Sequence, residues 1–172
     1  ISSAPVWQLH VDGDMDEDVT RRALAALVRR YPVLVSRAVP ARDGRTLDRS
    51  RRIAYEVDPS PRMDDLFRVV DLRADDAGFA GVQQEAFDNH IDMTRDYPAR
   101  ITWVRRSGTR SVLMFQQHHG IADGRAFWRC LEDFCAYYDQ AAEGTLPQEI
   151  LPIGRVSEAV VAEPSLVRRI GA

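Results

Sequence analysis

Two adjacent histidines, an aspartate and a glycine within seven residues are the part of this chain best suited to chemistry. His118 and His119 follow an apolar run at residues 112–115 that is typical of a buried strand, and Asp123 and Gly124 precede a helical pattern. A histidine side chain exchanges protons near neutral pH, and a strand-to-helix junction can hold it rigidly at a cleft. The spacing therefore predicts an acid–base site at this junction.

The hydrophobic pattern predicts the elements that would position these residues. After the junction, apolar residues recur on one face of a helix, namely Phe127, Cys130, Leu131, Phe134, Cys135 and Tyr138. Strands are predicted at residues 6–11, 33–39, 53–57, 66–71, 100–105 and 112–115, and helices at residues 19–31 and 79–90 and, as a short final helix, from Ser165. This order predicts a mixed sheet with helices packed on it.

A metal site is the main rival to acid–base chemistry at the junction. His118, His119 and Asp123 are ligand types, but adjacent histidines seldom converge on one ion, and no further cluster of His, Cys or acidic residues completes a set. Cys130 and Cys135 both fall on the apolar face of one predicted helix, which favours reduced core residues over a disulfide. We therefore expect no bound metal and no disulfide.

The composition excludes several other kinds of function. The 172-residue chain has a net charge of −3 and a pI of about 5.8, so it has no excess of positive charge for nucleic acid or an anionic membrane. No apolar run approaches the ~20 residues that span a bilayer, and no signal-peptide pattern opens the chain, so a cytoplasmic protein is expected. All 23 basic residues are arginine, which excludes lysine-based Schiff-base chemistry by this chain.

Residues 118–124, His-His-Gly-Ile-Ala-Asp-Gly, match the signature HHxxxDG, and the chain resembles the CoA-dependent acyltransferase superfamily. That superfamily includes chloramphenicol acetyltransferases, condensation domains of nonribosomal peptide synthetases and polyketide-associated acyltransferases. Residues 30–34, Arg-Tyr-Pro-Val-Leu, are similar to the R-H-P-x-L that follows the family's first long helix. The resemblance implies an α/β (α+β) sandwich, a mixed sheet flanked by helices as in a chloramphenicol-acetyltransferase-like lobe.

The position of the signature implies one lobe of a two-lobed enzyme. In single-lobed relatives the signature lies near the C-terminus, whereas here a long segment follows it. We expect residues 1–142 to form an N-terminal acyltransferase lobe and residues 143–172 to form a linker or strap towards a second lobe that is absent from this chain. Since the chain begins at Ile1 and not at Met, we also expect that a segment upstream is missing.

The resemblance implies a role for each residue of the signature. His119 is the expected general base, which removes a proton from the acceptor as it attacks an acyl thioester; the alternative is an ordinary, partly buried histidine. His118 is expected to point into the protein and hold the loop. Asp123 is expected to pair with Arg100, although its place four residues after His119 also allows a catalytic dyad. Gly124 is expected to permit a backbone conformation or a close approach that a Cβ would block.

The expected activity is transfer of an acyl group from a thioester to an alcohol or amine, and it is expected to need the second lobe. No tightly bound cofactor is expected, because the co-substrate is acyl-CoA or an acyl group on a phosphopantetheinyl carrier protein. Arg125 and residues 137–147 favour the polyketide-associated acyltransferases that esterify lipid alcohols. Two alternatives stay open. One is an amide-forming condensation domain; such domains usually have arginine where Val35 stands, so Val35 counts against this alternative. The other is a non-catalytic lobe that docks a carrier.

Overall fold

The computed structural model describes residues 4–40, 53–108 and 110–153 of the chain. The strands of this part are β1 (Val6–Asp12), β2 (Ser36–Pro40), β3 (Ile53–Val57), β4 (Phe67–Asp71), β5 (Ala99–Arg105) and β6 (Arg110–Gln117). The helices are α1 (Glu17–Arg30), α2 (Met63–Leu66), α3 (Phe79–Asp88) and α4 (Gly124–Glu143), with 3₁₀ helices at Pro32–Val35 and Asp76–Gly78.

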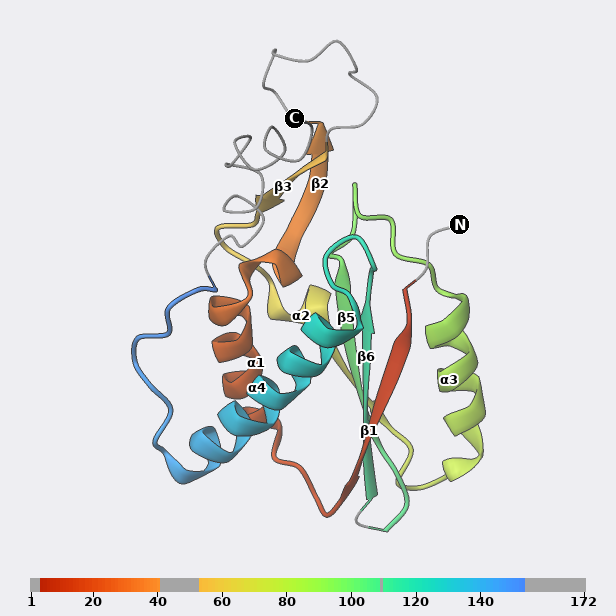
Figure 1. Cartoon of the computed structure of the whole chain (residues 1–172). Coiled ribbons are helices and arrows are strands. Elements are labelled where there is room, and N and C mark those ends of the chain that lie inside the picture. Colours follow the sequence, from red (N-terminus) through yellow and green to blue (C-terminus); the bar gives the residue numbers. More distant parts are fainter. Residues whose placement is uncertain (1–3, 41–52, 109, 154–172) are drawn as a thin grey trace, which may run out of the picture.

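The larger sheet brings three strand ends to one edge. Its order is β1–β6–β5–β4, with β1 and β5 antiparallel to β6 and with β4 parallel to β5. β6 ends at Gln117, which pairs with Ala99 at the start of β5, while Val6 at the start of β1 pairs with Gln116. The chain therefore leaves β6 at the edge where β1 and β5 begin, and α4 starts close by (Figure 1).

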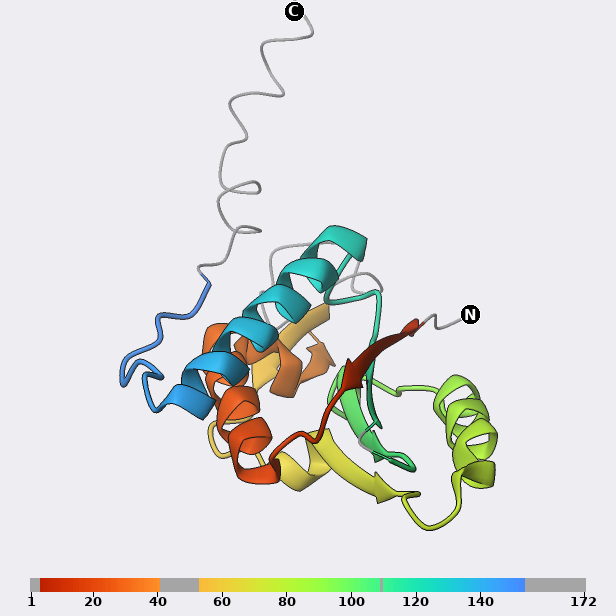
Figure 2. The same ribbon diagram turned by 90° about the horizontal axis from the view of Figure 1, so that it is seen from below.

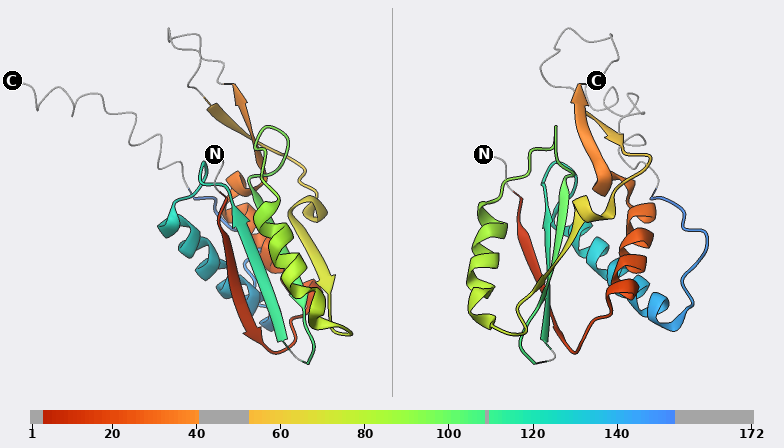
Figure 3. Two further views of the ribbon diagram at one scale, coloured as in Figure 1. Left: turned by 90° about the vertical axis from the view of Figure 1, so that its right-hand side faces the viewer. Right: turned by 180° about the vertical axis from the view of Figure 1, so that it is seen from behind.

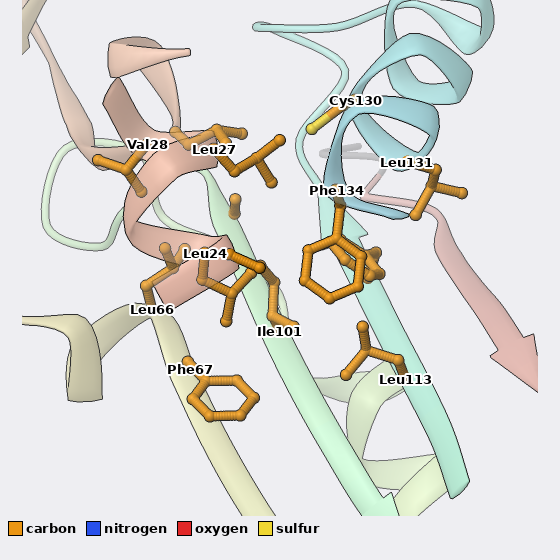
Figure 4. Packing of buried hydrophobic residues seen from close by; sticks show 14 of the residues in the cluster. Leu24, Leu27, Val28, Leu66, Phe67, Ile101, Leu113, Cys130, Leu131 and Phe134 are labelled. Atoms are coloured by element: carbon orange, nitrogen blue, oxygen red, sulfur yellow. The ribbon is translucent and has the colours of Figure 1, made fainter. Parts of the chain in front are cut away.

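Helices cover both faces of this sheet. α1 and α4 pack together on one face, and α3 lies on the other (Figures 1 and 2). In the core under α1 and α4, Leu24 and Leu27 face Phe134 of α4 and Ile101 and Leu113 of the sheet (Figure 4). The buried residues of the core under α3 are Ala86, Val104, Val112 and Met114. These layers confirm the predicted α/β sandwich.

A side-chain cap starts each of the two longest helices. Asp16 accepts a hydrogen bond from the amide of Val19 at 2.9 Å and opens α1, while Asp123 accepts from the amide of Ala126 at 2.8 Å and opens α4. Such caps satisfy backbone donors that have no partner inside the helix. α4 ends at Gly144, whose φ of 73° is the left-handed conformation that favours glycine. Both helices thus begin where the sequence offers an acidic cap.

Some predicted boundaries are wrong by a few residues. The strand expected at residues 33–39 starts at Ser36, because the chain first makes a 3₁₀ turn in which the Ser36 hydroxyl donates to the carbonyl of Val33 at 2.7 Å. An apolar run with Val33 in it does not distinguish a short helix from a strand. Leu66, expected in a strand, ends the one-turn helix α2.

The prediction that both cysteines are core residues is wrong for one of them. Cys130 is buried, whereas Cys135 is exposed, and both thiols are free. At 100° per residue, Cys135 lies about 80° round the helix from Phe127, at the margin of the apolar stripe. Burial raises the pKa of the Cys130 thiol to about 12, so this thiol stays protonated.

The segment after α4 returns to the end of α1. The guanidinium of Arg30 donates to the carbonyl of Leu151 at 2.8 Å, and the amide of Ile153 donates to the carbonyl of Arg30 at 2.9 Å. The division into a lobe (1–142) and a strap (143–172) stays a prediction, and the helix expected from Ser165 lies outside the described residues. Within the described ranges, no helix is both long enough and apolar enough to cross a membrane.

β2 and β3 form a separate antiparallel pair, here called the β2–β3 ribbon. It extends beyond the edge of the main sheet at which β6 ends (Figures 1 and 3). Ala38 of β2 lies opposite Tyr55 of β3, and the amide of Ala38 donates to the carbonyl of Met93 at 2.7 Å. The ribbon is thereby attached to the segment that leads into β5.

Candidate active site

Residues 118–123 form a short loop between β6 and α4, here called the signature loop. The amide of His118 donates to the carbonyl of Pro98 at 2.8 Å, which continues the contact between β6 and the start of β5. The amide of Ile121 donates back to the carbonyl of His118 at 3.0 Å, and Asp123 then caps α4. The loop is therefore fixed at both ends, and it carries the two histidines between the sheet edge and the start of the helix.

His119 is the more accessible of the two histidines. Its side chain is exposed, and its Nδ1 lies 3.4 Å from the carbonyl oxygen of Ala122, at the long end of hydrogen-bond distances. In the tautomer with a proton on Nδ1, that N–H points to an acceptor, and Nε2 keeps a lone pair. An imidazole in this state can accept a proton from a bound substrate.

His118 has a different environment. Its side chain is half-buried, and its Nδ1 accepts a hydrogen bond from the amide of Gly120 at 2.9 Å. Because an accepting Nδ1 carries no proton, this bond selects the neutral imidazole protonated on Nε2. Burial, and to a smaller extent the neighbouring His119, lower the pKa of His118 below its ordinary value. His118 therefore holds the turn as a neutral group.

Asp123 and Arg100, which the resemblance led us to expect as an ion pair, have other partners. The carboxylate of Asp123 is exposed and caps α4. The guanidinium of Arg100 donates to Asp96 at 2.8 Å and to the carbonyl of Asn89 at 3.0 Å, beside a hollow of about 240 Å³ on the α3 side of the sheet. Among the described residues, Asp123 makes no ion pair with Arg100 and no hydrogen bond with His119.

The close approach expected at Gly124 is found at another glycine of the loop. Gly124 has no positive φ, and a Cβ added there would meet no atom within 4 Å in the described part. At Gly120, by contrast, an added Cβ would lie 2.8 Å from Cε of Met93, 3.0 Å from Nδ1 of His118 and 3.1 Å from the hydroxyl of Tyr55. No motif in the sequence marks Gly120, because it occupies a variable position of the signature.

A small hollow beside His119 has an aromatic wall. Its lining includes Trp7, Gln117 and Phe127, and its volume is about 20 Å³, enough for about one water molecule. The rings of Trp7 and Phe127 stack at a centroid distance of 5.0 Å, and Trp128 packs edge-on against Trp7 at 5.3 Å. The hollow is too small for an acyl substrate.

The described residues contain no obvious metal site. Within these ranges, no three His, Cys, Asp or Glu side chains lie close enough together to hold an ion. The chemistry that the described part of the site can support by itself is proton transfer by His119.

Comparison with known proteins identifies the family. A family model described as "Condensation domain" matches residues 6–152, and the chain therefore belongs to the condensation-domain family. This confirms the predicted resemblance to the CoA-dependent acyltransferase superfamily. Condensation domains are in general acyltransferases. No curated protein matches the chain.

Solved structures with the same fold come from peptide synthetases and from antibiotic biosynthesis. The first condensation domain of the calcium-dependent antibiotic synthetase is 21% identical, with a TM-score of 0.74, and the match covers 98% of this chain and 39% of that chain. The starter condensation domain of rhizomide synthetase is 16% identical, with a TM-score of 0.73, and the match covers 91% and 37%. The X-domain in complex with OxyB from teicoplanin biosynthesis is 20% identical, with a TM-score of 0.68, and the match covers 86% and 30%.

Two facts follow from these matches. The chain spans less than two-fifths of the length of each of these three structures. The matches are to condensation domains and an X-domain, so they do not support the polyketide-associated assignment expected from Arg125. They favour the alternative that the chain is part of a condensation domain.

Proposed function

We propose that the complete protein forms an amide by moving an acyl group from a phosphopantetheinyl thioester on a carrier protein to an amine, as a condensation domain of a peptide synthetase does. The observation that carries this proposal is His119. It is the second histidine of the signature in a chain of the condensation-domain family, and it is exposed where β6 meets α4. Structures with the same fold include condensation domains of two synthetases. In this proposal the acyl carrier is a transient partner and no cofactor is tightly bound.

The proposed role of His119 is that of a general base. The acceptor amine attacks the carbonyl carbon of the thioester, a C–N bond forms, and Nε2 of His119 takes a proton from the nitrogen. The tetrahedral intermediate then breaks its C–S bond, and the thiolate leaves with a proton that the imidazolium returns. His119 ends the cycle neutral. General acid–base catalysis of this kind contributes about 10²- to 10⁴-fold to a rate.

The second lobe completes the cleft in this proposal. The hollow beside His119 is too small for an acyl chain, and Trp128, next to it on α4, is 54% exposed. Contiguous exposed apolar patches larger than a few hundred Å² mark interaction surfaces, and in this proposal Trp128 belongs to such a patch, which the second lobe covers. We therefore expect the lobe without its partner lobe to expose this aromatic surface and to show no acyl transfer.

A non-catalytic docking lobe is the second candidate. Its support is the structure of the X-domain, which has this fold and was solved in complex with a partner protein, OxyB. Such a lobe would retain the fold and bind a protein without turnover.

Product analysis separates these candidates. The complete protein is incubated with an acyl group loaded on a phosphopantetheinyl carrier protein and with an amine or an alcohol acceptor, and the products are identified by mass. The proposal predicts an amide with the amine and none with His119→Ala. An ester alone would support the polyketide-associated alternative. Carrier binding without any product, in wild type and variant alike, would support the docking lobe and overturn the proposed activity.

A further inference from the structure

Tyr55, in the β2–β3 ribbon, makes a hydrogen bond to the signature loop. Its hydroxyl donates to the carbonyl oxygen of Gly120 at 2.7 Å, across a separation of 65 residues in the chain. Gly120 directly follows His119, so this bond fixes the peptide group between Gly120 and Ile121, one residue beyond the exposed imidazole. Burial raises the pKa of the Tyr55 phenol further above neutral, so the hydroxyl is protonated and can donate.

The space around Gly120 shows that this contact is close. An added Cβ would lie 3.1 Å from the Tyr55 hydroxyl, 3.0 Å from Nδ1 of His118 and 2.8 Å from Cε of Met93. Cβ atoms essentially never come within 3.0 Å of another heavy atom, and a gap of 3.0 to 3.4 Å requires the neighbour to move. A Cβ at Gly120 would therefore need shifts of a few tenths of an ångström in the Tyr55 hydroxyl and in the His118 ring, and a larger movement of the flexible end of Met93.

The position of Tyr55 is itself fixed by the fold. Tyr55 pairs with Ala38 across the ribbon, and Ala38 is bonded through its amide to the carbonyl of Met93. Met93 then lies against Gly120, and Gly120 accepts from Tyr55. These four residues form a closed ring of contacts, which places the backbone of Tyr55 within reach of the signature loop, and the hydrogen bond to Gly120 holds its hydroxyl there.

We propose that Tyr55 is a positioning residue for His119. Tyr55 fixes the Gly120 carbonyl and thereby the loop backbone that carries the imidazole. This inference rests on the proposed function, because it assigns Tyr55 to the reaction in which His119 is the base. A general base must lie within hydrogen-bond distance of the proton that it takes, and displacements of the order of 1 Å reduce rates strongly. Tyr55 itself contacts no reacting atom in this proposal.

The first test compares two tyrosine-to-phenylalanine variants of the complete protein. Tyr55→Phe removes only the hydroxyl that bonds to Gly120. Tyr31→Phe is the matched control, because it removes a hydroxyl that donates to Asp133 at 2.7 Å between α1 and α4, away from the signature loop. For amide formation between carrier-bound substrates, we expect Tyr55→Phe to lower kcat about five- to tenfold with KM within about twofold, the worth of one hydrogen bond. Tyr31→Phe should keep the wild-type kcat.

The second test measures loop order without a substrate. Hydrogen–deuterium exchange of a peptide spanning residues 117–126 should be faster in Tyr55→Phe than in wild type, and unchanged in Tyr31→Phe. Gly120→Ala, whose Cβ requires the Tyr55 hydroxyl to move by a few tenths of an ångström, should increase exchange in the same peptide, whereas the control Gly81→Ala, whose Cβ meets no atom within 4 Å, should not. In Gly120→Ala/Tyr55→Phe, the losses of activity should be less than additive, because both changes act on one contact.

The results separate this inference from the proposed function. If His119→Ala abolishes amide formation and Tyr55→Phe alters neither kcat nor the exchange of residues 117–126, the positioning role is wrong and the proposed function stands. If His119→Ala keeps full activity, the proposed function is wrong, and the positioning role of Tyr55 is wrong with it. An equal loss of kcat in Tyr55→Phe and Tyr31→Phe would also overturn the positioning role, since it would show a general effect of lost stability.

Discussion

Replacing Asp123 tests what the aspartate of the signature does in this chain. Asp123→Ala removes the side-chain oxygen that accepts from the Ala126 amide at 2.8 Å and leaves the first turn of α4 without its cap. Loss of an N-cap costs about 1 kcal/mol, with a range of about 0.5–2 kcal/mol. Loss of one partner of a buried ion pair costs about 3–5 kcal/mol. Because the carboxylate is exposed and bonded to the helix, the structure predicts the smaller loss.

A double-mutant cycle with Arg100 makes this prediction sharper. Arg100→Ala breaks the ion pair with Asp96 and the bond to the Asn89 carbonyl, neither of which involves Asp123. Residues that share no partner give additive effects within about 0.5 kcal/mol. We therefore expect the free energies of unfolding lost in Asp123→Ala and Arg100→Ala to sum in the double variant.

The assay is urea unfolding of the complete protein, followed by tryptophan fluorescence. Asp123→Asn is the matched control, because asparagine also caps helices well, and it should retain most of the stability that Asp123→Ala loses. A loss above about 3 kcal/mol in Asp123→Ala, together with a coupling to Arg100 above about 1 kcal/mol, would refute the cap and establish the buried pair that the resemblance implies.

Two further predictions concern titration and thiol reactivity. The pKa of His118 is lower in the folded protein than its ordinary value of about 6.5 in the unfolded chain, so between these two values the unfolded state binds more protons. The stability linked to His118 is therefore present above about pH 6.5, and it is lost as the pH falls through the lower pKa of the folded state. The melting temperature should fall less between pH 7.5 and 5 in His118→Asn, which keeps an acceptor near Nδ1, than in wild type; equal slopes would contradict this. Iodoacetamide should label Cys135 and leave Cys130 unmodified in the native protein, as judged by peptide mass, because Cys130 is buried with a pKa of about 12; labelling of Cys130 at the rate of Cys135 would contradict the packing of α4.

Much of the fold was predictable because its elements have clear periodicity and ends. α1 has an acidic cap, an apolar stripe and Pro32 after it, and α4 has Asp123 before it and Gly144 behind it. These signals are local, so they survive without any knowledge of the tertiary structure. The 3₁₀ turn at residues 32–35 was not predictable, since a short apolar run suits a buried strand as well as a helix.

The site was predictable only where a motif marks it. The signature located His118, His119 and Asp123, but it could not show that Arg100 has Asp96 as a nearer partner, because that choice depends on how the segment before β5 folds. The contact between Tyr55 and Gly120 joins residues 65 positions apart in the chain and involves no fixed position of the signature. Contacts of this kind are set by the docking of the ribbon, which the sequence pattern does not encode locally.

The rate of amide formation in a single turnover tests the central claim, that His119 is the general base, most directly. The complete protein, in wild-type form and as His119→Ala, is mixed in excess with an acyl carrier thioester and an aminoacyl carrier thioester, and the rate constant of product formation is measured. The proposed role of His119 predicts a fall of about 10²- to 10⁴-fold in His119→Ala with an unchanged melting temperature. A fall of less than about threefold in a variant of unchanged stability would be within the range of small positional effects and would contradict the claim.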